Sequence, residues 1–187
     1  NKYRAGDSQV DKLIVLGLGL LGASICAAAK KLGLANEIIG ISRRQSTIEI
    51  AHAKEIIDKS SDSLATLAGN FGEDDLLVLA VPTLAMKSVL SECQEHVPPS
   101  VTITDVASVK TKIIEFAEQV YGDIPKNFVP GHPIAGSEKS GINAANPDLF
   151  KNHKVVLTPK EMTNQGHINK VSETVSYTHL RAHETNS

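Results

Sequence analysis

The chain has 187 residues, of which 41% are apolar and 21% are charged, a composition typical of globular proteins and not of disordered ones. Its 19 basic and 21 acidic side chains give a net charge of −2, so no global positive field attracts nucleic acid or an anionic membrane. Aromatic residues make up only 4% and tryptophan is absent, which argues against a base-stacking surface. No apolar run approaches the ~20 residues of a membrane span. We therefore expect neither a membrane nor nucleic acid as a partner.

The two cysteines, Cys26 and Cys93, lie far apart and lack the spacing of a metal site. We expect them to be small core residues of a reduced protein, and we expect no metal. No signal peptide is recognisable, which favours the cytoplasm, or the organelle stroma in a plastid-bearing source. Because the chain begins at Asn1 without a methionine, we expect it to be a fragment.

From residue 11 onward, strand and helix patterns alternate along the chain. Short apolar runs predict strands at 13–16, 37–41, 76–81 and 101–106, with two final short ones at 128–130 and 155–157. Apolar residues at helical spacing predict helices at 21–32, 46–55, 62–68, 86–93 and 109–120. This alternation is typical of an α/β fold of the Rossmann type, with a doubly wound, mostly parallel sheet and crossover helices on both faces.

The same pattern divides the chain into three parts. Residues 1–10 are polar and have no period, so we expect a disordered lead-in. Residues 11–163 are expected to form the Rossmann-type domain. Residues 164–187 are expected to hold a partial helix and then an atypical tail without an apolar stripe, which we interpret as a non-native addition and leave out of the fold.

The first predicted strand is followed by the glycine-rich stretch GLGLLG, which has the G-x-G-x-x-G spacing of a dinucleotide-binding loop. Gly17 would allow the tight turn, Gly19 the approach of a pyrophosphate, and Gly22 close packing of helix on strand. At Leu20 and Leu21 the helix begins, and its N–H groups and positive dipole end would face the phosphates. Glycines also serve ordinary strand–helix turns, but the placement between strand and helix favours cofactor binding.

The end of the second predicted strand indicates which dinucleotide binds. NAD-binding domains usually place an Asp or Glu there, which accepts hydrogen bonds from the ribose hydroxyls. This chain has Ser42, Arg43 and Arg44 instead. Two guanidinium groups can bind a ribose 2′-phosphate through paired, charge-assisted hydrogen bonds. We therefore expect NADP in preference to NAD, with two merely solvated arginines as the alternative.

In open parallel sheets, ligands bind at the carboxyl ends of the strands. Three later segments reach this edge, at residues 81–83, 105–110 and 131–138. From the first two we expect cofactor contacts by Val81, Pro82, Asp105 and Ala107.

The third segment contains His132, the strongest candidate for acid–base chemistry. It lies between glycine and proline in an expected loop, and histidine titrates near neutral pH. A single histidine is more often structural or solvated, but the other histidines of the orderly part lack this placement. Ser108 begins a predicted helix, where it would be an N-cap, a role compatible with a substrate contact.

With these residues the chain resembles the prephenate/arogenate dehydrogenase family of tyrosine biosynthesis. The matching stretches are VLGLGLLGASI, DVASVK, GHPIAGSEKSG, NPDLF and VVLTP, and GISRRQST is similar to the NADP-using arogenate branch. The resemblance implies an NAD(P)-dependent oxidative decarboxylation of arogenate or prephenate, with hydride transfer to the nicotinamide. It also implies that His132 takes the proton of the substrate ring hydroxyl, that Ser108 contacts this hydroxyl and orients the histidine, and that Glu138 lies at the active-site entrance.

Family members continue into a helical C-terminal domain that forms a homodimer and binds the substrate carboxylates. We expect this 187-residue stretch not to include that domain and therefore to turn over little or no substrate alone.

Two alternatives remain open. A dehydrogenase of the β-hydroxyacid type would need a catalytic lysine on a later helix, and no convincing candidate is present. A non-catalytic NADP-binding module would need no acid–base residue, so His132 argues against it, while the missing domain argues for it.

Overall fold

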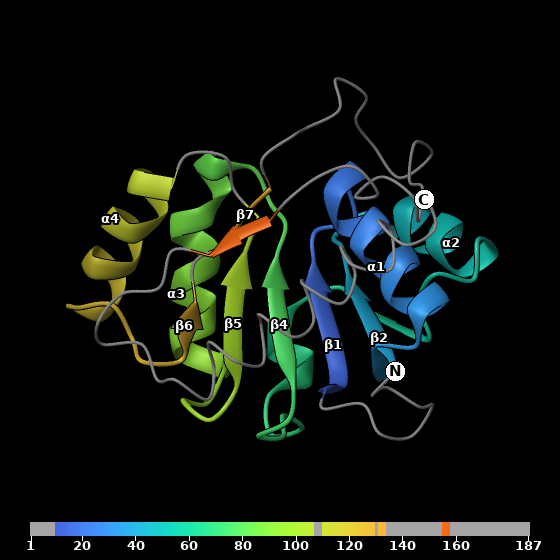
Figure 1. Ribbon diagram of the computed structural model, residues 1–187, viewed down its shortest axis with the longest axis horizontal. Coiled ribbons are helices and arrows are strands. Elements are labelled where there is room, and N and C mark those ends of the chain that lie inside the picture. Colours follow the sequence, from blue (N-terminus) through green and yellow to red (C-terminus); the bar gives the residue numbers. More distant parts are fainter. Residues whose placement is uncertain (1–9, 107–109, 130, 134–154, 158–187) are drawn as a thin grey trace.

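The chain forms a six-stranded parallel sheet with helices on both faces, as the computed structural model in Figure 1 shows. The described residues are 10–106, 110–129, 131–133 and 155–157. Outside them lie the predicted lead-in up to residue 9, the predicted tail, and the site residues Ala107, Ser108 and Glu138.

The strands of this sheet lie in the order β3-β2-β1-β4-β5-β6. Their bounds are β1 (Val10–Leu16), β2 (Ala35–Ile41), β3 (Lys59–Ser61), β4 (Leu76–Leu79), β5 (Thr102–Asp105) and β6 (Phe128–Val129). The chain starts in the middle of the sheet, adds β2 and β3 on one side, and then crosses back to add β4, β5 and β6 on the other. The fold is therefore doubly wound, as predicted, and its topological switch point lies between β1 and β4.

The helices of the described part connect these strands as crossovers. They are α1 (Leu20–Leu32), α2 (Gln45–Ala53), α3 (Met86–His96) and α4 (Lys110–Tyr121), with two 3₁₀ turns, η1 (Leu64–Leu67) and η2 (Thr83–Ala85). Helix α1 ends at Gly33, as predicted, because this residue adopts a left-handed conformation with φ +63° and its N–H donates to the carbonyls of the last turn.

Alternate residues of the central strand enter two separate cores. Leu13 and Val15 of β1 pack with residues of α1 and α2, whereas Ile14 and Leu16 pack with residues of α3 and α4. All four side chains are buried, and each contributes about 1.5–3 kcal/mol through removal of its apolar surface from water. This two-sided burial explains why the strand is a continuous apolar run without alternation.

The edge strand β3 is absent from the sequence prediction, which placed no strand between 41 and 76. Its residues, Lys59–Ser61, are polar and pair only with β2. Asp58 anchors its start, because its N–H donates to the carbonyl of Ile38 at 2.8 Å and its carboxylate accepts from the N–H of Ile38 at 2.8 Å. The helix predicted at 62–68 is also wrong in type, since this segment contains only the short 3₁₀ turn η1.

A second, two-stranded sheet pairs β7 (Gly131–Pro133) with β8 (Val155–Leu157) in antiparallel fashion. The predicted strand at 155–157 is confirmed, but the loop predicted around His132 is wrong. His132 lies within β7, in register with Val156. The flanking glycine and proline make this short strand look like a loop in the sequence.

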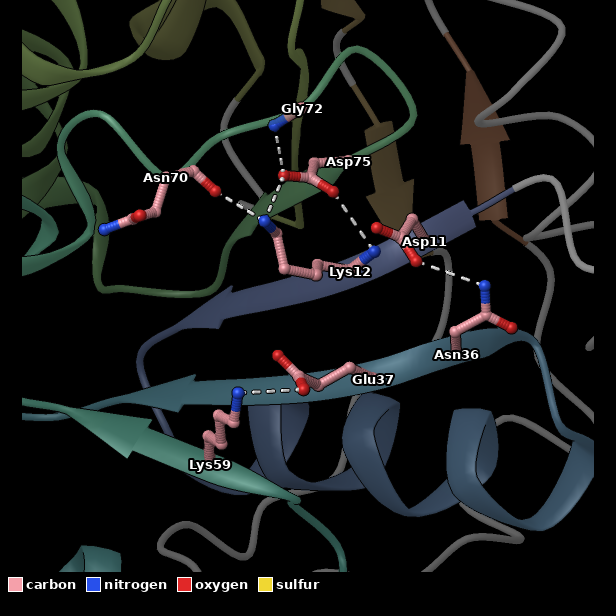
Figure 2. A network of polar contacts seen from close by, with 8 residues as sticks. All are labelled: Asp11, Lys12, Asn36, Glu37, Lys59, Asn70, Gly72 and Asp75. Atoms are coloured by element: carbon pink, nitrogen blue, oxygen red, sulfur yellow. Dashed lines mark hydrogen bonds and ion pairs between the residues drawn. The ribbon is translucent and has the colours of Figure 1, made fainter.

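A polar network closes the amino ends of the central strands (Figure 2). The buried carboxylate of Asp75 lies 3.3 Å from the Lys12 ammonium, and accepts from the N–H groups of Lys12 at 3.2 Å and Gly72 at 2.7 Å. The Lys12 ammonium also donates to the carbonyl of Asn70. Two further polar pairs lie at this end: Asn36 with Asp11, and Lys59 with Glu37. The network lies at the edge opposite the carboxyl ends, so it fixes the strands and leaves the ligand-binding edge clear.

Candidate functional site

Two glycines of the segment after β1 leave no room for a side chain, Gly17 in the turn and Gly22 in the first turn of α1. Gly17 has φ +102°, and a Cβ there would lie 2.4 Å from the carbonyl oxygen of Ala80. A Cβ on Gly22 would lie 1.8 Å from the carbonyl oxygen of Gly17 and 3.1 Å from the Cβ of Ala80. Helix α1 therefore starts in direct backbone contact with the turn, and the turn in direct contact with the chain after β4.

Gly19 differs from its two neighbours in the motif. It is the N-cap of α1, with φ −73°, and in the described part of the chain no atom beyond its two sequence neighbours lies within 4 Å of a Cβ built on it. As a glycine it has no side chain that could accept a capping hydrogen bond, and the first turn of α1 has no acidic residue. Leu20 is buried and Leu21 half-buried, so what these two residues offer at the helix start is backbone N–H. Open space beside uncapped N–H groups at a positive helix end fits an anionic group such as a pyrophosphate.

A further glycine supports this turn from β2. A Cβ on Gly40 would lie 2.9 Å from Leu18 Cδ1 and 3.1 Å from Ile57 Cγ2. Leu18, the residue between the first two glycines of the motif, is only 3% exposed and packs into the space that Gly40 leaves. Sequence analysis did not identify Gly40, although a glycine inside a strand is itself a signal of close approach.

A cavity of about 280 Å³ opens at the carboxyl ends of β1, β2 and β4, beside the glycine turn. Its position at the switch point is where ligands bind in this class of fold. The residues that line it include five of the predicted cofactor contacts: Gly17, Ser42, Arg43, Val81 and Pro82.

The remaining predicted contacts that the structure describes are not among the residues that line this cavity. Arg44 is exposed and forms the N-cap of α2, where its N–H donates to Ser42 Oγ at 3.2 Å. Asp105, at the carboxyl end of β5, is 1% exposed. Of the two arginines predicted to act together, only Arg43 lines the cavity.

Two carboxylates that the sequence analysis missed also line the cavity. Asp62 follows β3, and Glu92 lies on α3. The Glu92 carboxylate accepts a hydrogen bond from Arg43, with Nη2 and Oε1 3.4 Å apart. No spacing in the sequence relates Glu92 to Arg43, because the two are brought together only by the packing of α3 on one face of the sheet.

The backbone of His132 comes to the same edge of the sheet through β7. This strand contacts β5, the strand that ends at Asp105 (Figure 1). The structure thus brings the His132 segment to the carboxyl side of the fold, as the sequence analysis expected. Its predicted partners Ser108 and Glu138 lie outside the described residues.

The two cysteines are structural, as predicted. Burial raises the pKa of the Cys26 thiol to about 12, and burial together with the neighbouring Glu92 charge raises the pKa of the Cys93 thiol to about 12. Both are unpaired and fully buried, and they lie in different cores. Neither provides a thiolate near neutral pH, so neither is a candidate nucleophile.

Within the described ranges, every helix is too short or too polar to cross a lipid bilayer.

Comparison with known proteins shows the family to which the chain belongs. A family model described as the nucleotide-binding domain of prephenate dehydrogenase matches residues 25–183, and so extends into the stretch left out of the predicted fold. The prephenate dehydrogenase of Lactococcus lactis subsp. cremoris (strain MG1363) is 38% identical over 148 residues, which are 79% of this chain and 40% of that protein. The chain spans about two fifths to one half of the length of the curated relatives it matches.

Solved structures give the same result. The crystal structure of prephenate dehydrogenase from A. aeolicus, in complex with hydroxyphenyl propionate and NAD+, has a TM-score of 0.79 at 28% identity and covers 90% of this chain and 57% of its own. The structure of Synechocystis arogenate dehydrogenase has a TM-score of 0.78 at 34% identity, with the same coverage of 90% and 57%.

Proposed function

Because the chain belongs to the prephenate dehydrogenase family, as its nucleotide-binding domain, we propose that it forms the cofactor-binding part of an oxidoreductase of tyrosine biosynthesis. The reaction is the NADP-dependent oxidative decarboxylation of arogenate or prephenate. The observation that carries this proposal is the joint placement of the glycine turn and the cavity at the switch point between β1 and β4.

The residues at this edge fit a dinucleotide. The open side of Gly19 and the first-turn N–H groups of α1 would hold the pyrophosphate. The adenosine ribose would then lie toward the end of β2, at Ser42 and Arg43. No carboxylate ends β2, and a guanidinium lines the cavity there, which supports NADP over NAD.

The chemistry requires one base and good alignment. When bound, the nicotinamide supplies the hydride acceptor. His132 would accept the proton of the ring hydroxyl as the C–H bond at that carbon breaks, and Ser108 would orient the hydroxyl and the histidine. The bond to the departing carboxylate then breaks, and its electrons complete the aromatic ring, so the protein needs no strong acid. Glu138 would lie at the entrance to this site.

In the whole enzyme, a C-terminal helical domain would bind the substrate carboxylates and form the dimer contacts. The 187-residue chain alone is then expected to bind NADP and to turn over little or no substrate, because substrate alignment contributes a large share of such rate enhancements.

The test uses a longer protein that joins this chain to such a domain. With NADP+ and either arogenate or prephenate, the absorbance of the reduced nicotinamide should rise. His132→Asn should keep NADP affinity and lower kcat by roughly 10²–10⁴, the usual contribution of a positioned general base. Tight NADP binding without turnover of either substrate would favour the non-catalytic module instead. An unchanged kcat in the variant would refute His132 as the base.

A further inference from the structure

We propose that Glu92 is a specificity-determining residue of the cofactor site: by holding the Arg43 guanidinium, it weakens the preference for nucleotides that carry a ribose 2′-phosphate. This inference rests on the cofactor site proposed above. It concerns a residue on α3, far in sequence from the end of β2, where the choice between the two dinucleotides is ordinarily made.

The geometry joins the two sides of the cavity. Arg43 follows β2 and Glu92 lies on α3, and both line the cavity. Their side chains meet at 3.4 Å. Arg43 is 83% exposed and Glu92 35% exposed, so water and a ligand can both reach the pair. The guanidinium that would bind a 2′-phosphate is therefore already bound to a carboxylate.

The charges that line the cavity explain why the contact between Arg43 and Glu92 should affect the choice of ligand. The charged side chains among its described lining residues are one cation, Arg43, and two carboxylates, Asp62 and Glu92. A 2′-phosphate brought to Arg43 has to replace Glu92 as its partner and then lies close to that carboxylate. A ribose 2′-hydroxyl carries no charge, so a nucleotide without the phosphate leaves the pair intact. Glu92 thus acts selectively against the phosphorylated ligand.

The size of the effect follows from the exposure of the pair. An exposed ion pair changes an equilibrium constant by about fivefold at most, and a phosphate dianion roughly doubles the interaction energy of a single charge. Glu92→Gln keeps the size of the side chain and removes its charge. We expect this substitution to strengthen binding of a 2′-phosphorylated nucleotide by about 3- to 10-fold.

The experiment measures binding to the 187-residue chain by calorimetry, with adenosine 2′,5′-bisphosphate and AMP as probes. These two ligands differ only in the 2′-phosphate and need no catalytic activity. Glu92→Gln should bind the bisphosphate about 3- to 10-fold more tightly and should leave AMP affinity within about 1.5-fold. The matched control is Glu95→Gln, on the same helix, because Glu95 is 74% exposed, contacts His96, and is outside the cavity lining.

The role of Arg43 is tested by repeating Glu92→Gln in an Arg43→Ala background. There the gain should fall below about twofold, because the partner through which Glu92 acts is gone. If Glu92→Gln behaves like Glu95→Gln, or if its full gain persists without Arg43, the inference is overturned.

These outcomes separate the inference from the proposed cofactor preference. If the unaltered chain prefers the bisphosphate, and Arg43→Ala abolishes that preference, but Glu92→Gln changes nothing, only the inference fails. If the unaltered chain shows no preference and Glu92→Gln creates one that depends on Arg43, the inference stands and the NADP preference fails. If neither substitution affects either probe, both fail.

Discussion

Replacing Gly22 or Gly19 by alanine should affect different properties of the protein. The first substitution should lower stability, and the second should lower cofactor affinity. A Cβ on Gly22 would lie 1.8 Å from a backbone oxygen, and no side-chain rotation relieves that overlap. Helix α1 must move by roughly an ångström or more, at a cost of about 3 kcal/mol, the upper range for overpacked sites. For a chain of this length that corresponds to a fall in Tm of about 6–12 °C.

Gly19→Ala has a different expected result. Among the described residues other than its chain neighbours, no atom lies within 4 Å of the added methyl group, and the backbone φ of −73° suits alanine. Stability should change by no more than about 1 kcal/mol, the range for an altered N-cap. The methyl group would instead occupy the space beside the helix N-terminus, so NADP affinity should fall by about 10- to 100-fold, as for loss of a charged hydrogen bond.

Thermal unfolding followed by circular dichroism, together with calorimetric titration of NADP+, measures both effects. The reasoning is refuted if Gly22→Ala melts with the unaltered chain, or if Gly19→Ala lowers Tm as much as Gly22→Ala does. It is also refuted if Gly19→Ala binds NADP+ normally, because the open side of that residue would then face no phosphate.

Three further results are expected. Arg43→Ala should weaken NADP binding by about 1.5–3 kcal/mol and leave NAD binding nearly unchanged, and equal losses in a titration of both cofactors would contradict this. Cys26 and Cys93, with thiol pKa values of about 12, should react with a thiol reagent near pH 8 only at the rate of unfolding; rapid labelling of the native chain would show that burial does not protect them. Burial would raise the pKa of Asp58, but hydrogen bonds from Lys30 and Ile38 and the Lys30 charge outweigh it and lower the pKa below its ordinary 3.8. Asp58 therefore stabilises the fold above that pH and loses its contribution on acidification, so Asp58→Asn should cost up to about 1 kcal/mol at pH 7 and less at pH 3, measured by denaturant unfolding.

The sequence predicts those parts of the fold that depend on a local pattern of apolar residues. The inner strands β1, β2 and β4 are recognisable because two-sided burial favours apolar runs, and the crossover helices because their apolar residues have helical spacing. Strand β3 has no such pattern, since Lys59–Ser61 is polar and its pairing with β2 is a backbone interaction. The strand at His132 cannot be predicted from the sequence, because glycine and proline flank this residue.

The candidate site divides in the same way. Gly17, Gly19 and Gly22 are found from spacing because the turn that needs them is local. Arg43 and Glu92 are 49 residues apart in sequence, and only the packing of α3 on the face of the sheet brings them together. The charges at a binding site depend on which residues tertiary packing brings together. The residues at the end of one strand therefore do not reveal all of them.

Affinity for a dinucleotide and the choice between two dinucleotides therefore depend on different kinds of structure in this chain. The turn proposed to bind phosphate is fixed by backbone contacts at Gly17 and Gly22, where even one added methyl group would meet main-chain atoms. Arg43 and Glu92 are the residues expected to distinguish the 2′-phosphate. Arg43 is 83% exposed and Glu92 pairs with this exposed side chain, so replacing either should change the stability of the fold little. Substitutions at these two positions can shift cofactor preference without disturbing the turn, whereas substitutions in the turn affect both cofactors alike. Cofactor preference should accordingly be adjustable in this chain independently of its stability.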